Sequence, residues 1–127
     1  RALEYSYSPY SHYAVGAALL CEDGRVFTGC NVENASFGLT NCAERTAIFT
    51  AVFEGKREFE AIAVVGGKDG VARDFFPPCG VCRQVMLEFC DPDFKIYMGK
   101  QDGTYKTVKL ADFMPYGFRA SEYMKEP

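Results

Sequence analysis

The spacing of hydrophobic positions changes several times along this chain, and each spacing predicts one element. Between residues 14 and 31 apolar positions alternate on both sides of Asp23-Gly24, a strong turn signal, which predicts a β-hairpin. The small and polar residues 34–41 predict a loop. Residues 42–54 carry alanines and larger apolar side chains at helical spacing, so we expect a helix, capped by Thr40 or Asn41 and ended by Gly55.

The second half of the chain continues this exchange of strand and helix patterns. The apolar run 61–65 predicts a buried strand, 66–78 a loop, 80–90 a helix and 94–98 another strand. Asp102-Gly103 then turns the chain into a strand at 105–108, and a short helix is expected after Ser121. The order β-β-α-β-α-β-β predicts a three-layer α/β/α domain with a five-stranded mixed sheet.

Length and charge narrow the class of protein. The 127 residues predict one domain, 1–127, that is large enough to bury a core. The formal net charge is −3 and the 14 basic residues are scattered, so we expect no nucleic acid partner, which would require a clustered basic face. The sequence contains no apolar run as long as a membrane span and no visible signal peptide, and we expect a cytoplasmic protein without a membrane partner.

The six cysteines of the chain could form disulfides or bind a metal ion. In a secreted protein they could form three disulfides, but a core of this size needs none, and in a cytosolic protein such spacing indicates metal binding or catalysis. Two motifs contain three of them: Asn41-Cys42-Ala43-Glu44-Arg45 and Pro78-Cys79-Gly80-Val81-Cys82-Arg83-Gln84.

The chemistry of these motifs fits a catalytic zinc. Three thiolates suit Zn²⁺, and three protein ligands leave a fourth position for water. Cys42 opens one predicted helix, and Cys79 and Cys82 lie in the first turn of the other, where the helix end stabilises thiolates. Glu44 is then expected to move protons to and from the bound water rather than to bind the metal.

Three thiolates on Zn²⁺ leave a net charge of −1, which should weaken the acidity of the bound water. Arg45 is placed to offset this charge, and Arg83 and Gln84 could do so by hydrogen-bonding a thiolate.

Two alternatives remain for the cysteine motifs: a closed structural zinc site and a redox pair. A lone Cys-x-x-Cys is found in zinc ribbons and thioredoxin-like proteins, and His12, Cys21, Cys30 or Cys90 could supply a fourth ligand. The combination of Cys-Ala-Glu with Pro-Cys-x-x-Cys is more specific, since it is the signature of zinc-dependent deaminases, with the glutamate as general acid and base.

The chain resembles the cytidine deaminases, in particular the small class of about 130 residues per subunit. The resemblance covers nearly the whole sequence. Its most specific stretches are the two metal motifs, Ser8-Pro9-Tyr10-Ser11-His12-Tyr13-Ala14-Val15-Gly16-Ala17-Ala18-Leu19, and Gly29-Cys30-Asn31-Val32-Glu33-Asn34-Ala35.

This resemblance implies a cytidine deaminase-like fold, a homotetramer and one Zn²⁺ per subunit held by Cys42, Cys79 and Cys82. It implies that Glu44 carries the proton and contacts the pyrimidine N3, and that a nucleoside is the substrate. The remaining implied roles are binding of the ribose 3′-hydroxyl by Asn31 and Glu33, contact of the Ala43 N–H with the base O2, contact of Ala35 with a neighbouring subunit's site, and packing of Tyr13 and Phe118 around the pyrimidine. Without the resemblance, Asn31 and Glu33 would be a solvated strand end, and Tyr13 and Phe118 remain equally consistent with ordinary core aromatics.

The sequence departs from the family pattern at two aromatic positions and at its start. Tyr13 stands where phenylalanine is usual, and Phe37 stands where tyrosine is expected. The helix usual ahead of Tyr10 is cut short at Arg1.

The implied reaction is hydrolysis of cytidine, and of deoxycytidine, to uridine or deoxyuridine and ammonia. Two rivals are a deaminase that acts on another aminopyrimidine compound, such as blasticidin S, or on nucleic acid, and a non-enzymatic zinc-stabilised interaction domain.

Overall fold

The computed structural model describes residues 2–114, apart from the side chain of Phe37. Phe118 and the helix expected after Ser121 therefore lie outside the described residues. None of the helices in this part of the chain has the length and apolar character that crossing a bilayer requires.

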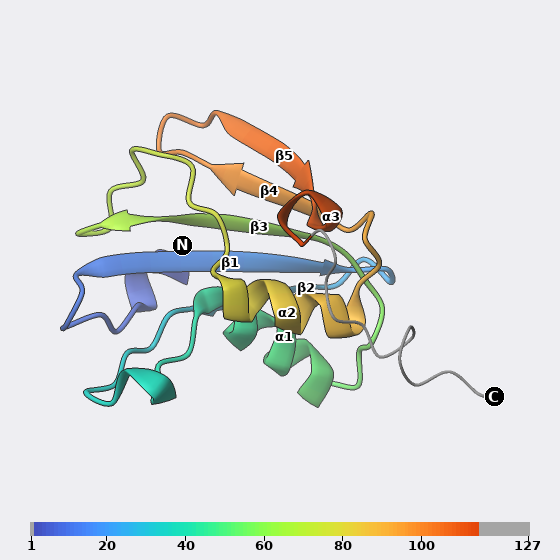
Figure 1. The fold of residues 1–127 in the computed structure, drawn as a ribbon, viewed down its shortest axis with the longest axis horizontal. Coiled ribbons are helices and arrows are strands. Elements are labelled where there is room, and N and C mark those ends of the chain that lie inside the picture. Colours follow the sequence, from blue (N-terminus) through green and yellow to red (C-terminus); the bar gives the residue numbers. More distant parts are fainter. Residues whose placement is uncertain (1, 115–127) are drawn as a thin grey trace.

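Five strands form one mixed sheet in the order β2-β1-β3-β4-β5 (Figure 1). Strands β3 and β4 are parallel and the other neighbours are antiparallel. The strands are β1 (Tyr13–Cys21), β2 (Val26–Cys30), β3 (Phe59–Lys68), β4 (Lys95–Gly99) and β5 (Tyr105–Lys109). The helices are α1 (Ala43–Phe53), α2 (Gly80–Phe89) and α3 (Leu110–Phe113), with short 3-10 helices η1 (Ala2–Tyr5) and η2 (Phe37–Leu39).

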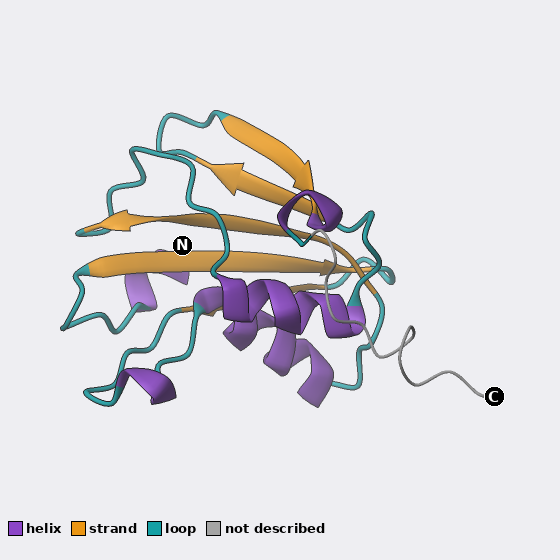
Figure 2. Cartoon of the chain, viewed as in Figure 1, coloured by secondary structure: helices purple, strands orange, loops and turns teal. Residues whose placement is uncertain are grey.

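The core lies between the sheet and the two longer helices. Both α1 and α2 cover one face of the sheet, as Figures 1 and 2 show. The buried side of β1, which includes Leu19, meets Ile48 from α1 and Met86 from α2 in one apolar cluster. These three side chains are completely buried, so each removes its apolar surface from water and contributes about 1.5–3 kcal/mol.

The opposite face of the sheet is covered differently. Among the described residues, η1 is the helix that packs there, against β1 and β2. A Cβ built at Gly16 would lie 3.0 Å from the backbone nitrogen of Leu3 and 3.3 Å from the Cβ of Ala2, so glycine permits this close approach. The N-terminal segment is thereby held against β1, which begins directly after the loop at residues 6–12.

The predicted order of the five strands and the two longer helices is confirmed. The differences concern boundaries and three short helices that were not predicted, η1, α3 and η2, the last within the expected loop 34–41. Strand β3 runs from Phe59 to Lys68 rather than over 61–65 alone, because it pairs with nearly the whole of β1. The N-cap of α1 is Cys42, without a side-chain cap, so the expected capping by Thr40 or Asn41 is wrong. Gly55 follows the helix with a φ of 87°, as expected of a C-terminal glycine.

Candidate active site

Three cysteine side chains meet where two helices begin. Cys42 is the N-cap of α1, Cys79 is the N-cap of α2, and Cys82 lies in the first turn of α2. Their sulfur atoms all lie within 4.8 Å of one another. Cys82 is buried, Cys42 is half-buried and Cys79 is exposed, so the cluster opens to solvent on one side.

The distances between these sulfurs fit one zinc ion. The Sγ atoms of Cys42 and Cys79 are 3.6 Å apart, and those of Cys79 and Cys82 are 3.3 Å apart. Two sulfurs bound to one tetrahedral zinc at about 2.3 Å would be about 3.8 Å apart. The cluster therefore needs only a small adjustment to hold Zn²⁺ through three thiolates.

Arg45 lies close enough to this cluster to act on its charge. Its Nη2 donates to the Cys42 sulfur at 3.3 Å and to the Thr40 carbonyl at 3.0 Å. The hydrogen bond from Cys82 and that from Arg45 together lower the pKa of the Cys42 thiol to about 5, against the opposing effect of burial. The same contact between Cys42 and Cys82, with burial and the charge of Glu44, raises the pKa of Cys82.

Glu44 is the buried carboxyl group beside the cluster. It follows the N-cap of α1 by two residues and is only 2% exposed. Burial, with a smaller contribution from the negative charge of Cys42, raises the pKa of Glu44 to about 7. A carboxyl group that titrates near neutral pH can both accept and return a proton, which is what a general acid and base requires.

A second polar group lies at the end of β2. Asn31 and Glu33 are 7% and 8% exposed, although both are polar. Glu33 accepts from the backbone N–H groups of Tyr10 and Ser11 and from the Ser11 hydroxyl. Burial opposes ionisation, but these hydrogen bonds outweigh it and hold the pKa of Glu33 below its ordinary value.

Backbone hydrogen bonds join these two groups into one site. The N–H of Val32 donates to the Asn41 carbonyl at 2.8 Å, and the N–H of Asn41 returns the bond at 2.9 Å. The Thr46 hydroxyl lies 3.1 Å from both the Cys30 carbonyl and the Cys42 carbonyl. The segment that carries Asn31 and Glu33 is therefore fixed directly to the start of α1.

Comparison with known proteins matches this arrangement to one family. The family model described as "Cytidine and deoxycytidylate deaminase zinc-binding region" matches residues 1–98. The chain belongs to this cytidine deaminase family.

Relatives and solved structures extend the similarity of this family member beyond the matched region. The cytidine deaminase of Halalkalibacterium halodurans is 49% identical over 96% of this chain and 89% of its own length. The structure of cytidine deaminase from Burkholderia pseudomallei has a TM-score of 0.84 and 49% identity, covering 92% of this chain and 91% of that one. The structure of the Mycobacterium tuberculosis cytidine deaminase has a TM-score of 0.76 and 42% identity, covering 92% and 88%. The predicted α/β cytidine deaminase-like fold is therefore confirmed.

Three other residues predicted for the site, Ala43, Tyr13 and Ala35, come from three different segments of this family member. Ala43, completely buried, begins α1, where backbone N–H groups have no acceptor within the helix. Tyr13 begins β1, and its ring centroid lies 6.4 Å from that of Phe76. The two rings line a pocket of about 250 Å³ together with Phe75 and the end of β3. Ala35 is exposed in the loop before η2.

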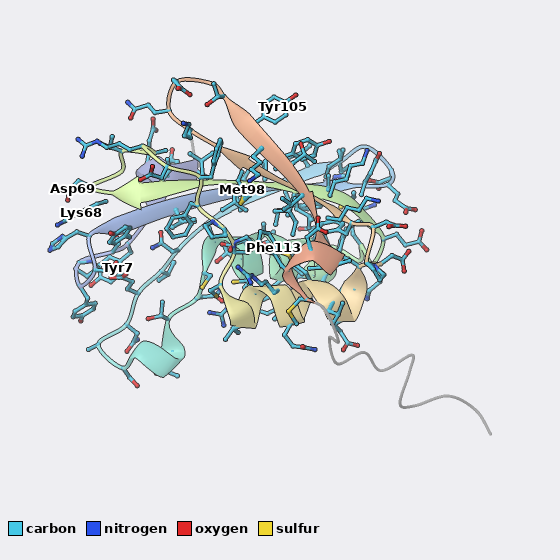
Figure 3. The ribbon with its side chains drawn as sticks, turned by 45° about the horizontal axis from the view of Figure 1, so that its top comes forward. Tyr7, Lys68, Asp69, Met98, Tyr105 and Phe113 are labelled. Atoms are coloured by element: carbon cyan, nitrogen blue, oxygen red, sulfur yellow. The ribbon has the colours of Figure 1, made fainter. Side chains whose placement is uncertain are left out.

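The two other residues proposed to offset thiolate charge are both in α2. The Arg83 Nε donates to the Pro78 carbonyl at 2.8 Å, and its guanidinium lies 4.2 Å from the ring centre of Phe113. Phe113 is seen above α2 in Figure 3. These contacts fix the loop that carries Cys79. Gln84 is half-buried in the same helix.

The sequence interpretation missed the hydroxyl groups that organise the site. The Ser6 hydroxyl donates to Asn31, and the Ser11 hydroxyl donates to Glu33. The Thr46 hydroxyl connects the two halves of the site, the cysteine cluster with Glu44 and the pair Asn31 and Glu33. Ser11 lies inside the stretch 8–19 that carried the family resemblance, but its contact with Glu33 spans 22 residues of chain. No local pattern reveals such a contact, because a lone serine in a loop has no periodic signal.

Proposed function

We propose that this protein deaminates cytidine and deoxycytidine by hydrolysis, releasing ammonia and leaving uridine or deoxyuridine. The observation that carries this proposal is Glu44, a buried carboxyl group with a pKa of about 7 beside three clustered thiols. Cys42, Cys79 and Cys82 would hold Zn²⁺, which when bound acts as a Lewis acid and makes a coordinated water more acidic.

The chain's own residues then position the base and move the protons. Glu44 takes one proton from the attacking water and gives it to ring N3. It then takes the second proton from the hydroxyl now on C4 and gives it to the amino group, which leaves as ammonia while C4 becomes a carbonyl. The near-neutral pKa of Glu44 suits both directions of transfer. The N–H of Ala43 donates to the base O2, and the Arg45 guanidinium, 3.3 Å from the Cys42 sulfur, offsets thiolate charge.

Sugar recognition falls to Asn31 and Glu33. An amide and a carboxylate can together hold a hydroxyl group that donates to one and accepts from the other. Their position next to Asn41, which precedes Cys42, supports a substrate whose sugar and base are bound at the same time. Tyr13, whose ring lies 6.4 Å from that of Phe76, is proposed to pack against the pyrimidine. Phe118 is proposed to share this role.

The decisive test replaces Glu44 with glutamine, which keeps the shape of the side chain and cannot carry the proton. Turnover of cytidine, followed by ultraviolet absorbance, should fall by roughly 10²–10⁴-fold while zinc content stays unchanged. Glu54→Gln, at the exposed end of the same helix, is the matched control. Near-normal turnover by the Glu44→Gln variant would rule out the shuttle role.

A substrate panel separates this function from the rivals. Cytidine, deoxycytidine, cytosine, CMP and blasticidin S are compared under the same conditions. We expect the two nucleosides to be deaminated far faster than free cytosine, because cytosine offers Asn31 and Glu33 no sugar. Equal rates for cytosine and cytidine would contradict sugar recognition, and a zinc-loaded protein that is inert toward all five compounds would favour an interaction domain.

We also propose that the protein is a cytoplasmic homotetramer, with Ala35 reaching a neighbouring subunit's site. All six cysteines are free thiols, which supports a reducing compartment. Exposed apolar side chains on the outside of α1 and α2, among them Phe53 at 89% and Val81 at 57%, support an interface between copies. Light scattering should report a smaller species for Phe53→Lys and an unchanged one for Tyr105→Lys, which alters a 66% exposed side chain on β5.

A further inference from the structure

The hydrogen bonds of Glu33 come from one short loop. Its Oε1 accepts the N–H groups of Tyr10 at 3.0 Å and Ser11 at 3.1 Å, and its Oε2 accepts the Ser11 hydroxyl. A carboxylate has about four acceptor positions. Three are filled by the loop, which leaves one acceptor position on Oε2 for a substrate hydroxyl.

Asn31 is engaged in the same manner. Its Oδ1 accepts the Ser6 hydroxyl and, at 3.0 Å, the N–H of Val15, while its Nδ2 donates to the Tyr13 carbonyl at 2.7 Å. One N–H of the amide is left over. The remaining donor of Asn31 and the remaining acceptor of Glu33 together suit one hydroxyl group.

Ser11 is the side chain that aims the Glu33 acceptor. Its hydroxyl donates to Oε2 and accepts the N–H of Tyr13 at 3.0 Å, so the serine rotamer is held from both sides. The two N–H bonds hold Oε1, and the Ser11 hydroxyl is the contact that holds Oε2. By occupying one acceptor position on Oε2, the hydroxyl determines the direction of the last Oε2 lone pair.

The backbone of this loop is itself held in an uncommon conformation. His12 has a φ of 63°, in the left-handed region, and its carbonyl accepts the N–H of Asp69 at 2.6 Å. Asp69 and Tyr7, labelled in Figure 3, lie at the end of the sheet where the loop is anchored. Since a non-glycine residue in this region is strained, the loop conformation is maintained by its contacts.

We propose that Ser11 is a positioning residue for sugar recognition, whose hydroxyl orients the Glu33 carboxylate toward a substrate hydroxyl. This inference rests on the function proposed above. Ser11 makes no contact with the reacting base in this assignment, so its loss weakens substrate binding and leaves proton transfer at Glu44 intact. A charge-assisted hydrogen bond of this kind corresponds to a roughly 5- to 30-fold change in binding.

The test compares Ser11→Ala with two other variants of the zinc-loaded full chain. Ser11→Thr keeps the hydroxyl, and Ser8→Ala removes a hydroxyl of the same loop whose oxygen lies 3.3 Å from the Ser6 hydroxyl oxygen. We expect KM for cytidine to rise roughly 5- to 30-fold in Ser11→Ala with kcat within about twofold, and both other variants to resemble the parent. Zinc content and melting temperature are measured for each protein.

A substrate lacking the 3′-hydroxyl separates positioning from a general effect on the fold. The parent and Ser11→Ala should convert 3′-deoxycytidine with the same kcat/KM, because the group that Glu33 recognises is absent. An unchanged KM for cytidine, or the same penalty on both substrates, would overturn the role of Ser11 while leaving the function intact. A parent protein that converts neither cytidine nor deoxycytidine would instead overturn the proposed function, and the role of Ser11 with it.

Discussion

Replacing Gly29 with alanine would place a methyl group in the contact between β2 and α1. The added Cβ would lie 2.6 Å from the Ala43 carbonyl oxygen, 2.6 Å from the Ala47 nitrogen and 2.9 Å from the Thr46 Cβ. Two of these are backbone atoms of a helix and have no rotamer with which to move away. To reach the 3.4 Å of ordinary contact, the strand and the helix would have to separate by about 0.8 Å.

The size of the effect follows from this displacement. Overpacking of a well-filled contact costs about 1–3 kcal/mol, so we expect the melting temperature to fall by roughly 5–10 °C. The separation also moves Glu44, on the first turn of α1, away from Asn31 and Glu33 at the end of β2, which are proposed to bind the sugar. A misplacement of about 1 Å costs on the order of 10²-fold in rate, so kcat should fall by one to two orders of magnitude.

Far-ultraviolet circular dichroism at fixed protein concentration measures the melting temperature, and the cytidine assay measures kcat. The chain has no tryptophan, so intrinsic fluorescence would be a weaker probe. Gly38→Ala is the matched control, because no atom lies within 4 Å of the Cβ it would add. A Gly29→Ala protein with the parent's melting temperature and kcat would refute the argument that backbone contact sets the spacing of the site.

Three further outcomes test other parts of the structure. Cys82→Ser should reduce zinc, measured by mass spectrometry, from one ion per chain to a small fraction, whereas Cys30→Ser should keep it, and equal zinc in both would contradict the three-thiol cluster. Because the folded pKa of Glu33 is lowered, its stabilising effect is complete above the unfolded value of about 4.3 and is lost as the pH falls through the folded value. The difference in melting temperature between the parent and Glu33→Gln should therefore shrink below about pH 4, and a constant difference would disprove it. Thr46→Val should lower the free energy of unfolding by about 1 kcal/mol and reduce kcat while zinc is retained. Thr50→Val, one turn further along α1, should change neither quantity. Equal kcat values for the two variants would count against the Thr46 hydroxyl as the connection between β2 and α1.

The fold was predictable from the sequence because its patterns are local. The hairpin around Asp23-Gly24 and the helices after Cys42 and Cys79 each show their period within a short window, and these elements formed where expected. The full length of β3 was not predictable, since only its pairing with β1 extends it to Lys68. The N-cap of α1 was also mispredicted. Threonine and asparagine are the residue types favoured at an N-cap, which pointed to Thr40 or Asn41, but Cys42 occupies that position.

The candidate site was predictable to the extent that its residues carry their own chemistry. Cys42, Cys79, Cys82 and Glu44 stand out by residue type and spacing, and the fold brings the three thiols together. Ser11 could not be found in this way, since its importance lies in a contact with Glu33 that only the folded loop creates. Its hydroxyl resembles that of any other loop serine until the partner is known.

The two halves of the site are held at a fixed spacing by groups that do no chemistry. The paired hydrogen bonds between Val32 and Asn41 are backbone bonds, and any residue other than proline could form them. Gly29 contributes by having no side chain, and Thr46 by one hydroxyl between two carbonyl groups. Because a sugar hydroxyl and a pyrimidine ring are separated by a fixed distance within one nucleoside, an error in this spacing cannot be corrected by better contacts at either end. The spacing of the two halves should therefore limit catalysis in addition to the acid–base group, through positions that a motif search would pass over.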